Sequence, residues 1–145
     1  MSYPITDIDG IEPEIAGRLK SVGIRTTGKL LEAAKSPKGR RVLAEKTGFD
    51  EKKILCWANL ADKMRIKGIG EEYAELLQAA GVDTVKELKY RNPCNLAKAL
   101  AAANGRRKLV RLLPSEKAVV RWIEHAKKLS LKISYSAPWR RAGGA

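Results

Sequence analysis

The segment Ile66-Lys67-Gly68-Ile69-Gly70, called turn two (66–70) below, lies between two runs of residues with helical periodicity. Apolar residues recur every three or four positions over residues 54–64 and again over residues 73–80. Two glycines in such a turn permit a positive φ and let an anion approach the backbone without a Cβ in the way. The helix expected to open at Glu71 adds unsatisfied N–H groups and the positive end of its dipole. The sequence therefore predicts that the amides of Gly68 and Gly70 hold a phosphate, with Lys67 adding charge at the rim. In the alternative interpretation the glycines only permit a tight turn between helices.

Composition favours a folded helical chain. Of its 145 residues, 44% are hydrophobic, 31% are charged and 6% are aromatic, which is typical of a globular protein and not of a disordered one. The hydrophobic residues are mainly Ala, Leu, Ile and Val, which favours packed helices over a β-sandwich. No apolar run approaches the length of about 18 residues that a membrane span needs, and the N-terminus lacks a signal-peptide pattern. We therefore expect a cytoplasmic protein.

Cysteine and histidine are too few for the common metal and catalytic sites. The chain has two cysteines, Cys56 and Cys94, and one histidine, His125, which cannot complete a four-ligand zinc site without carboxylates. Cys56 precedes Trp57 within a predicted helix, which favours a core or boundary position over a ligand or nucleophile. The sequence contains no Walker loop and no Ser/His/Asp or Cys/His arrangement. We therefore expect no enzyme, no metal ion and no cofactor.

Positive charge is concentrated in two segments of the chain. The formal net charge is +13. It divides into zero over residues 1–35, +4 over residues 36–65, zero over residues 66–104 and +9 over residues 105–145. Solubility alone does not require this uneven distribution, whereas a polyanionic partner would use it. A nucleic acid is therefore the expected partner.

An internal duplication accompanies this alternation of charge. At an offset of 58 residues, Ile8-Asp9-Gly10-Ile11 aligns with Ile66-Lys67-Gly68-Ile69. Later the offset grows to 65 residues, and there Trp57 aligns with Trp122. The chain therefore divides into unit one (5–65), unit two (66–132) and a flexible basic tail (133–145). We expect the two units to form one compact all-α body, in which turn one (8–12) is the counterpart of turn two.

Capping and helix-breaking residues predict about four helices in each unit. Signals for helix starts occur at the following positions: Pro13, Thr26, Ser36-Pro37, Asp50, Glu71, Thr84, Asn92-Pro93 and Ser115. We expect Asn104-Gly105 to interrupt the third helix of unit two. Strand signals are nearly absent, and only residues 132–135 are predicted to be a short extended segment.

The two units share a pattern that resembles the helix-hairpin-helix module. Unit two contains Gly68-Ile69-Gly70-x3-Ala74-x2-Leu77-x3-Gly81-Val82-x-Thr84, and unit one contains Gly10-Ile11-x4-Ala16-x2-Leu19-x3-Gly23-Ile24-x-Thr26. Similar modules are found at the N-termini of RecA-type recombinases and at the ends of DNA polymerases and ligases. The resemblance implies a SAM-like, recombinase N-terminal type of fold and binding of the DNA backbone without sequence readout. Turn one departs from the pattern, because Glu12 replaces the second glycine and Asp9 stands where turn two has Lys67.

The whole arrangement also resembles a bacterial family of uncharacterised proteins, domain-of-unknown-function family 4332. This resemblance rests on three sequence motifs, which are Pro37-Lys38-Gly39-Arg40-Arg41, Arg65-Ile66-Lys67-Gly68-Ile69-Gly70 and Leu113-Pro114-Ser115-Glu116-Lys117. The resemblance covers roughly residues 5–132. It implies a fold and assigns no biochemical activity.

The predicted nucleic-acid surface combines turn two with the basic second half of each unit. Lys117 and Arg121 lie four residues apart on the last predicted helix, with Trp122 near its opposite face. Acidic Glu71 and Glu72 directly follow turn two and oppose a phosphate there. The candidate residues are Lys38, Arg40, Arg41, Lys67, Gly68, Ile69, Gly70, Arg106, Arg107, Lys108, Arg111, Lys117 and Arg121.

Two functional hypotheses follow from the sequence. In the first, the chain is a non-enzymatic protein that binds DNA independently of sequence. In the second, it is an interaction module that docks a protein or an RNA, and its charge serves solubility or a ribosome-like surface. Trp57 and Trp122 are expected in the core in either case, whereas Trp139, beside Arg140-Arg141, could stack on a base.

Overall fold

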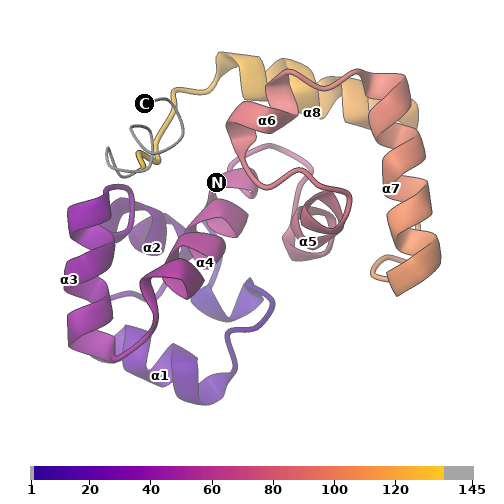
Figure 1. The fold of residues 1–145 in the computed structure, drawn as a ribbon. Helices are drawn as coiled ribbons and strands as arrows, with labels where there is room; N and C mark the ends of the chain where they lie inside the picture. Colours follow the sequence, from indigo (N-terminus) through magenta and orange to yellow (C-terminus); the bar gives the residue numbers. More distant parts are fainter. Residues whose placement is uncertain (1, 136–145) are drawn as a thin grey trace, which may run out of the picture.

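A computed structural model describes residues 2–135, and in this range the chain is all-helical, as the sequence predicts (Figure 1). Apart from one isolated bridge between Pro4 and Thr26, these residues form no β-structure. One 3-10 helix, η1, spans Ile5–Asp7. The α-helices are α1 Pro13–Ser21, α2 Thr27–Ala33, α3 Pro37–Thr47, α4 Glu51–Lys63, α5 Glu71–Ala79, α6 Val85–Lys89, α7 Pro93–Arg107 and α8 Glu116–Lys128.

Most helices begin at a side chain that caps their first turn, which explains why the sequence predicts their starts. The capping oxygen accepts a hydrogen bond from a backbone N–H two or three residues further on. These capping residues are Thr26, Ser36, Asp50, Thr84, Asn92 and Ser115. Thr84 also donates its hydroxyl to Glu87 Oε1 at 3.1 Å. The predicted helix starts are therefore confirmed.

The predicted interruption at Asn104-Gly105 is wrong, because α7 continues through both residues to Arg107. The side chain of Asn104 instead stabilises the turn after the helix. Its Oδ1 accepts a hydrogen bond from Val110 N at 2.9 Å, and its Nδ2 donates to Val110 O at 3.1 Å. The helix ends at Arg107, and the residue that caps its C-terminus, Lys108, adopts a left-handed conformation with φ of 51°.

Helix α4 lies at the centre of the molecule (Figure 1). It packs against α2 and α3 of the first half and against α5 and α6 of the second. Its apolar stripe, which includes Ile54, Trp57 and Ala58, is buried and belongs to one hydrophobic core that extends to Trp122 on α8. Trp57 and Trp122 are each only 3% exposed, so the prediction that both are core residues is confirmed.

A buried lysine connects the end of α4 to the second half of the chain. Lys63 has no solvent exposure, and its Nζ donates hydrogen bonds to Asp83 O at 2.8 Å and to Val82 O at 3.3 Å. Burial lowers the pKa of Lys63 to about 8, and the negative charge of Asp83 opposes this shift. The two carbonyl oxygens partly compensate the charge and fix the connection between α5 and α6.

The residues after α8 return to the first half of the chain. Arg65 Nη2 donates to Ser130 O at 3.1 Å, and Arg40 Nη2 donates to Ser134 O at 2.8 Å. Ser134 N in turn donates to Lys35 O at 2.8 Å. Residues 130–135 are thus attached to unit one. The remainder of the predicted flexible tail, including Trp139, lies outside the described residues.

None of the helices in residues 2–135 combines the length and the apolar character that crossing a bilayer requires. Across the same residues, no three His, Cys, Asp or Glu side chains converge on a point where they could hold a metal ion. Cys56 is half-buried and accepts a hydrogen bond from Gln78 Nε2 at 3.1 Å, which agrees with its predicted boundary position.

Candidate nucleic-acid interface

The two glycines of turn two have different backbone conformations. Gly68 has a φ of +93°, which L-residues rarely adopt, whereas Gly70 is extended, with φ of −93°, and is the N-cap of α5. A Cβ on Gly70 would meet no atom within 4 Å. Only Gly68 is therefore required by the backbone of the turn, and Gly70 leaves the N-terminus of α5 unobstructed. Ile69, between them, is fully buried and contributes to the core.

A tryptophan from the last helix of unit two packs against Gly68. A Cβ placed on Gly68 would lie 3.1 Å from Trp122 Nε1. Turn one shows the same relationship, since Gly10 has a φ of +89° and a Cβ there would lie 3.8 Å from Trp57 Nε1. Both turns therefore place a positive-φ glycine against an indole that the duplicated sequence aligns.

Helix α8 also holds turn two through a hydrogen bond to the backbone. Lys67 N donates to His125 Nδ1 at 3.1 Å. A neutral imidazole that accepts at Nδ1 carries its proton on Nε2. His125 therefore orients the peptide group at the start of the turn.

The amides of turn two are open to a ligand. In residues 2–135 no intramolecular hydrogen bond occupies the N–H of Gly68 or of Gly70. Helices α5 and α1 begin without a side-chain cap, at Gly70 and Glu12, whereas the other six described α-helices have one. Uncapped N–H groups at a helix start are available to an anion.

Carboxylates around the start of α5 oppose such an anion. Burial raises the pKa of Glu71, and the negative charges of Asp7, Asp9 and Glu72 raise it further. Burial also raises the pKa of Glu75, with a further contribution from Asp9. Asp9 of turn one and Asp7 at the end of η1 thus lie close enough to α5 to add negative charge beside turn two.

A basic segment, residues 106–111, is anchored next to α5. Tyr73 on α5 donates its hydroxyl to Leu112 O at 2.8 Å, and its ring lies 5.3 Å from the ring of Trp122. Arg107 Nη2 lies 3.7 Å from Glu75 Oε1. The four predicted cations of this segment, Arg106, Arg107, Lys108 and Arg111, are all exposed. Tyr73 and Trp122 therefore connect this segment to turn two.

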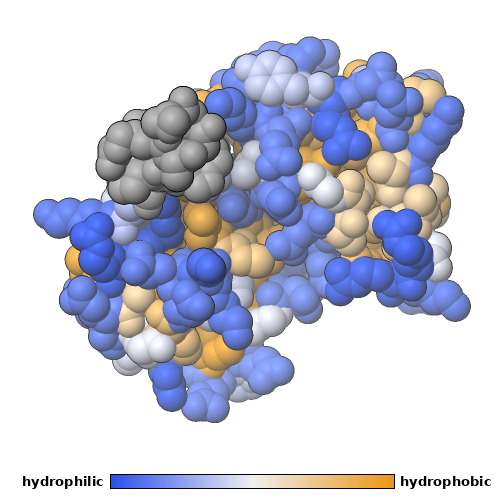
Figure 2. Space-filling model, in the orientation of Figure 1, coloured by the Kyte–Doolittle hydropathy of each residue, from blue (hydrophilic) through white to orange (hydrophobic). Residues whose placement is uncertain are grey.

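The polar face of α8 extends the positive surface of unit two. Lys117 and Arg121 are exposed, whereas Val119, Trp122 and Ile123 on the opposite face are buried. Within residues 2–135 neither Lys117 nor Arg121 forms an ion pair with a carboxylate. Figure 2 shows hydrophilic residues over α8 and over α3, with apolar residues visible over α7.

The basic residues predicted on α3 lie apart from those of unit two (Figure 1). Lys38 and Arg41 are exposed, but Arg40 is only 4% exposed. Its guanidinium donates to Ala34 O at 2.9 Å and to Ser134 O, and it lies 5.9 Å from the ring of Tyr135. Arg40 is therefore engaged inside the protein, and the structure does not bring α3 together with turn two.

Residues 9–129 match the family model described as Domain of unknown function (DUF4332). The chain belongs to this family. No curated protein and no solved structure matches it. Membership in DUF4332 assigns no activity to the chain.

Two residues at the candidate interface of this DUF4332 member were not identified from the sequence. Nothing in the sequence indicates that the imidazole of His125 reaches Lys67 N. The sequence places Tyr73 on an apolar helix stripe, and in the structure this residue connects Leu112 and Trp122. Its position seven residues before Ala80 on that stripe gave no signal for the hydroxyl contact.

Proposed function

We propose that this protein is a tandem helix-hairpin-helix protein that binds the phosphate backbone of DNA without reading its sequence and without catalysing a reaction. The two turns support the duplication of the module. Each contains a positive-φ glycine, Gly10 or Gly68, beside an aligned tryptophan. Turn two is followed by the uncapped helix α5, whose first N–H groups are available to an anion, whereas α1 begins at Pro13, which has no N–H.

The main support for DNA binding is a chain of side-chain contacts that connects turn two to the basic segment. Trp122 touches Gly68, the ring of Tyr73 lies against Trp122, and Tyr73 holds Leu112 at the end of residues 106–111. Open backbone amides and exposed cations therefore belong to one packed substructure. Phosphates spaced along a duplex can contact both features, whereas a single small anion would use only one.

The contributions of the candidate residues are unequal in this proposal. Arg106, Lys108 and Arg111 are exposed and, within residues 2–135, pair with no carboxylate, so they supply most of the attraction. Arg107 shares its charge with Glu75. Lys117 and Arg121 continue the surface along α8, while Lys38 and Arg41 belong to a separate patch. Ile69 and Arg40 act inside the fold.

Fluorescence anisotropy with labelled DNA tests the proposal. Two 20-base-pair duplexes of unrelated sequence are titrated at 50 mM and at 200 mM salt. Four phosphate contacts give a slope of log Kobs against log salt of about −3.6, so affinity falls about 100-fold between the two conditions. Both duplexes are expected to bind equally well, and absence of binding at 50 mM salt contradicts the proposal.

An RNA duplex of the same length and a single-stranded DNA serve as comparisons. Helix-hairpin-helix contact with a B-form backbone predicts weaker binding of the A-form RNA, because phosphates are arranged differently across its grooves. Tighter binding of the RNA would favour the alternative, an RNA-docking module.

A further inference from the structure

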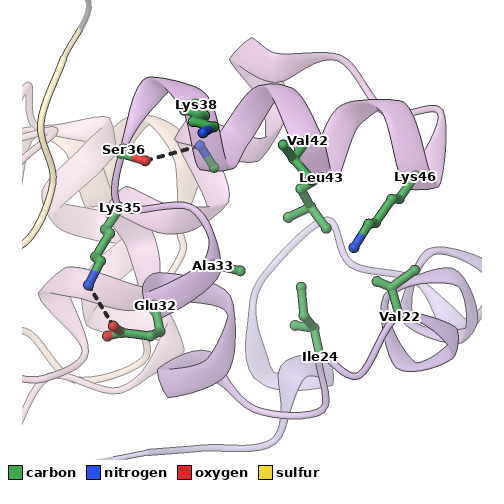
Figure 3. A pocket seen from close by; sticks show the side chains of 11 residues that line it. Val22, Ile24, Glu32, Ala33, Lys35, Ser36, Lys38, Val42, Leu43 and Lys46 are labelled. Carbon is green, nitrogen blue, oxygen red and sulfur yellow. Dashed lines mark hydrogen bonds and ion pairs between the residues drawn. The ribbon is translucent and has the colours of Figure 1, made fainter.

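A hollow of about 390 Å³ lies on unit one, between α3, the end of α2 and the connection that follows α1 (Figure 3). Its floor is apolar and is formed by Val22, Ile24, Ala33 and Leu43, and Val42 lines one side. Ile24 and Leu43 are each 4% exposed and close the bottom, whereas Val42 is 41% exposed at the side. The hollow thus leaves a large apolar side chain in contact with water.

Lysines border this apolar floor. Lys38, Val42 and Lys46 occur at intervals of four residues on α3, so they form one stripe along the helix. Figure 3 shows the side chain of Lys46 extending toward Val22 and Ile24. Lys35, the third lysine of the rim, pairs with Glu32 at 2.6 Å. Lys38 and Lys46 form no ion pair with any carboxylate in residues 2–135.

The corresponding space in unit two is used differently. Helix α7 packs on α8 and also along α5, and it buries Leu100 and Ala103, whereas α3 packs on α4 and α2 and makes no comparable contact with α1. Helix α3 spans 11 residues and α7 spans 15. The shorter helix of unit one therefore leaves a recess beside the segment that follows α1.

The shape of this recess favours a segment of a protein over a small molecule. Sites for small molecules enclose most of the ligand surface, commonly 70–90%, whereas this hollow is open on the side of Val42 and would cover only one face of a ligand. A peptide can insert one side chain and leave its other face to the rest of its own protein. A DNA backbone could approach the lysines but offers nothing apolar to cover the floor.

We propose that this hollow docks an extended acidic segment of a partner protein. One apolar side chain of the segment packs between Val42 and Ile24, and an Asp or Glu two positions to either side pairs with Lys38 or Lys46. The spacing agrees with this arrangement. Four residues of α3 span about 6 Å, and two residues of an extended peptide span about 6.6 Å. This site is independent of the DNA surface proposed for unit two.

Methyl NMR of the full chain tests the proposal with synthetic peptides. The probes are acetyl-Gly-Asp-Ala-Leu-Ala-Asp-Gly-amide and its analogue with Phe in place of Leu. Matched controls replace both Asp by Lys or replace the apolar residue by Ala. The two acidic apolar peptides are expected to shift the methyl signals of Ile24, Val42 and Leu43 and to bind at least tenfold more tightly than both controls.

Variants locate the site. The double variant Lys38→Glu, Lys46→Glu is expected to weaken binding of the acidic apolar peptides at least tenfold. The control, Lys98→Glu, Lys128→Glu, makes the same charge change on unit two and is expected to leave peptide binding unchanged. Val42→Ala is expected to weaken peptide binding severalfold, and it replaces the Lys38→Glu, Lys46→Glu variant as the test if that variant does not fold. The proposal is overturned if neither acidic apolar peptide shifts these methyl signals, or if the Ala-containing peptide binds equally. The proposal is also overturned if a DNA duplex produces the shifts in the methyl signals of Ile24 and Leu43 that are expected for the peptides.

Discussion

The indole of Trp122 packs so closely on Gly68 that a Cβ at Gly68 would lie 3.1 Å from its Nε1 atom. Gly68 also has a φ of +93°, so space and backbone conformation both require glycine. The pair links α8 to the turn that opens α5. The geometry of the candidate interface therefore depends on a contact between residues 54 positions apart in the sequence.

Gly68→Ala is expected to destabilise the protein, whereas Gly70→Ala is expected to have little effect on stability. A left-handed conformation costs an L-residue about 1–2 kcal/mol, and displacement of Trp122 adds to this. Gly70 is extended and its Cβ position is free. Urea denaturation of both variants measures the difference, and equal stabilities would contradict the role assigned to Gly68.

Gly70→Glu gives turn two the residue that stands at the equivalent position of turn one, Glu12. The fold is expected to remain intact, because an extended φ and free space accommodate the side chain. Affinity for a DNA duplex is expected to fall about tenfold, since a carboxylate then lies at the open amides and repels phosphate. Anisotropy together with circular dichroism measures both effects, and Gly70→Ala is the matched control. Unchanged affinity would assign turn two to architecture alone.

The stability of the protein is expected to rise with pH between about 8 and the ordinary pKa of lysine, 10.5, because of Lys63. Burial holds the pKa of Lys63 at about 8, so in this window the unfolded chain binds the proton that the folded chain has released. The full difference corresponds to about 3 kcal/mol. Urea denaturation at pH 7.5 and 10 is compared for the native chain and for Lys63→Met. Equal pH dependence in the two proteins would contradict the assignment.

Glu75 is expected to have the opposite effect on the pH dependence of stability, since its contribution falls as the pH rises. Its pKa is raised by burial and by Asp9, so the folded chain holds the proton more tightly than the unfolded chain does. This contribution to stability is present below the ordinary pKa of about 4.5 and is lost as the pH rises. Glu75→Gln is therefore expected to stabilise the protein more at pH 7 than at pH 4, as measured by the change in Tm. A larger increase in Tm at pH 4 would contradict this, because it would show that the ion pair with Arg107 outweighs burial and the charge of Asp9.

Local signals were sufficient to predict most of the fold. Capping residues such as Ser36 and Ser115 act within three residues of their helix starts, and they can be identified without tertiary information. The error at Asn104-Gly105 has a physical cause of longer range. The side-chain amide of Asn104 bonds to Val110, six residues away, so it stabilises the turn after α7 and does not end the helix.

The candidate site was predicted less completely than the fold. Lys108 and Arg111 are exposed because they lie beyond the last turn of α7. The charge distribution along the sequence was enough to predict that these residues belong to a basic surface. Arg40 has the same local sequence signal as Arg41, yet it is buried and donates a hydrogen bond to Ser134 O, 94 residues away. Contacts of this range, including that between Lys67 and His125, cannot be read from composition or periodicity.

The central claim, that the basic segment beside turn two binds the DNA backbone, is tested most directly by the salt dependence of affinity. The slope of log Kobs against log salt is measured for the native chain and for Arg106→Glu, Lys108→Glu, Arg111→Glu in combination. The matched control is Lys20→Glu, Arg25→Glu, Lys29→Glu, which changes the net charge equally on exposed positions of unit one. Three lost phosphate contacts are expected to flatten the slope by about 3, and the control is expected to retain the native slope. Equal slopes for the two triple variants would contradict the claim, because binding would then follow net charge and not this surface.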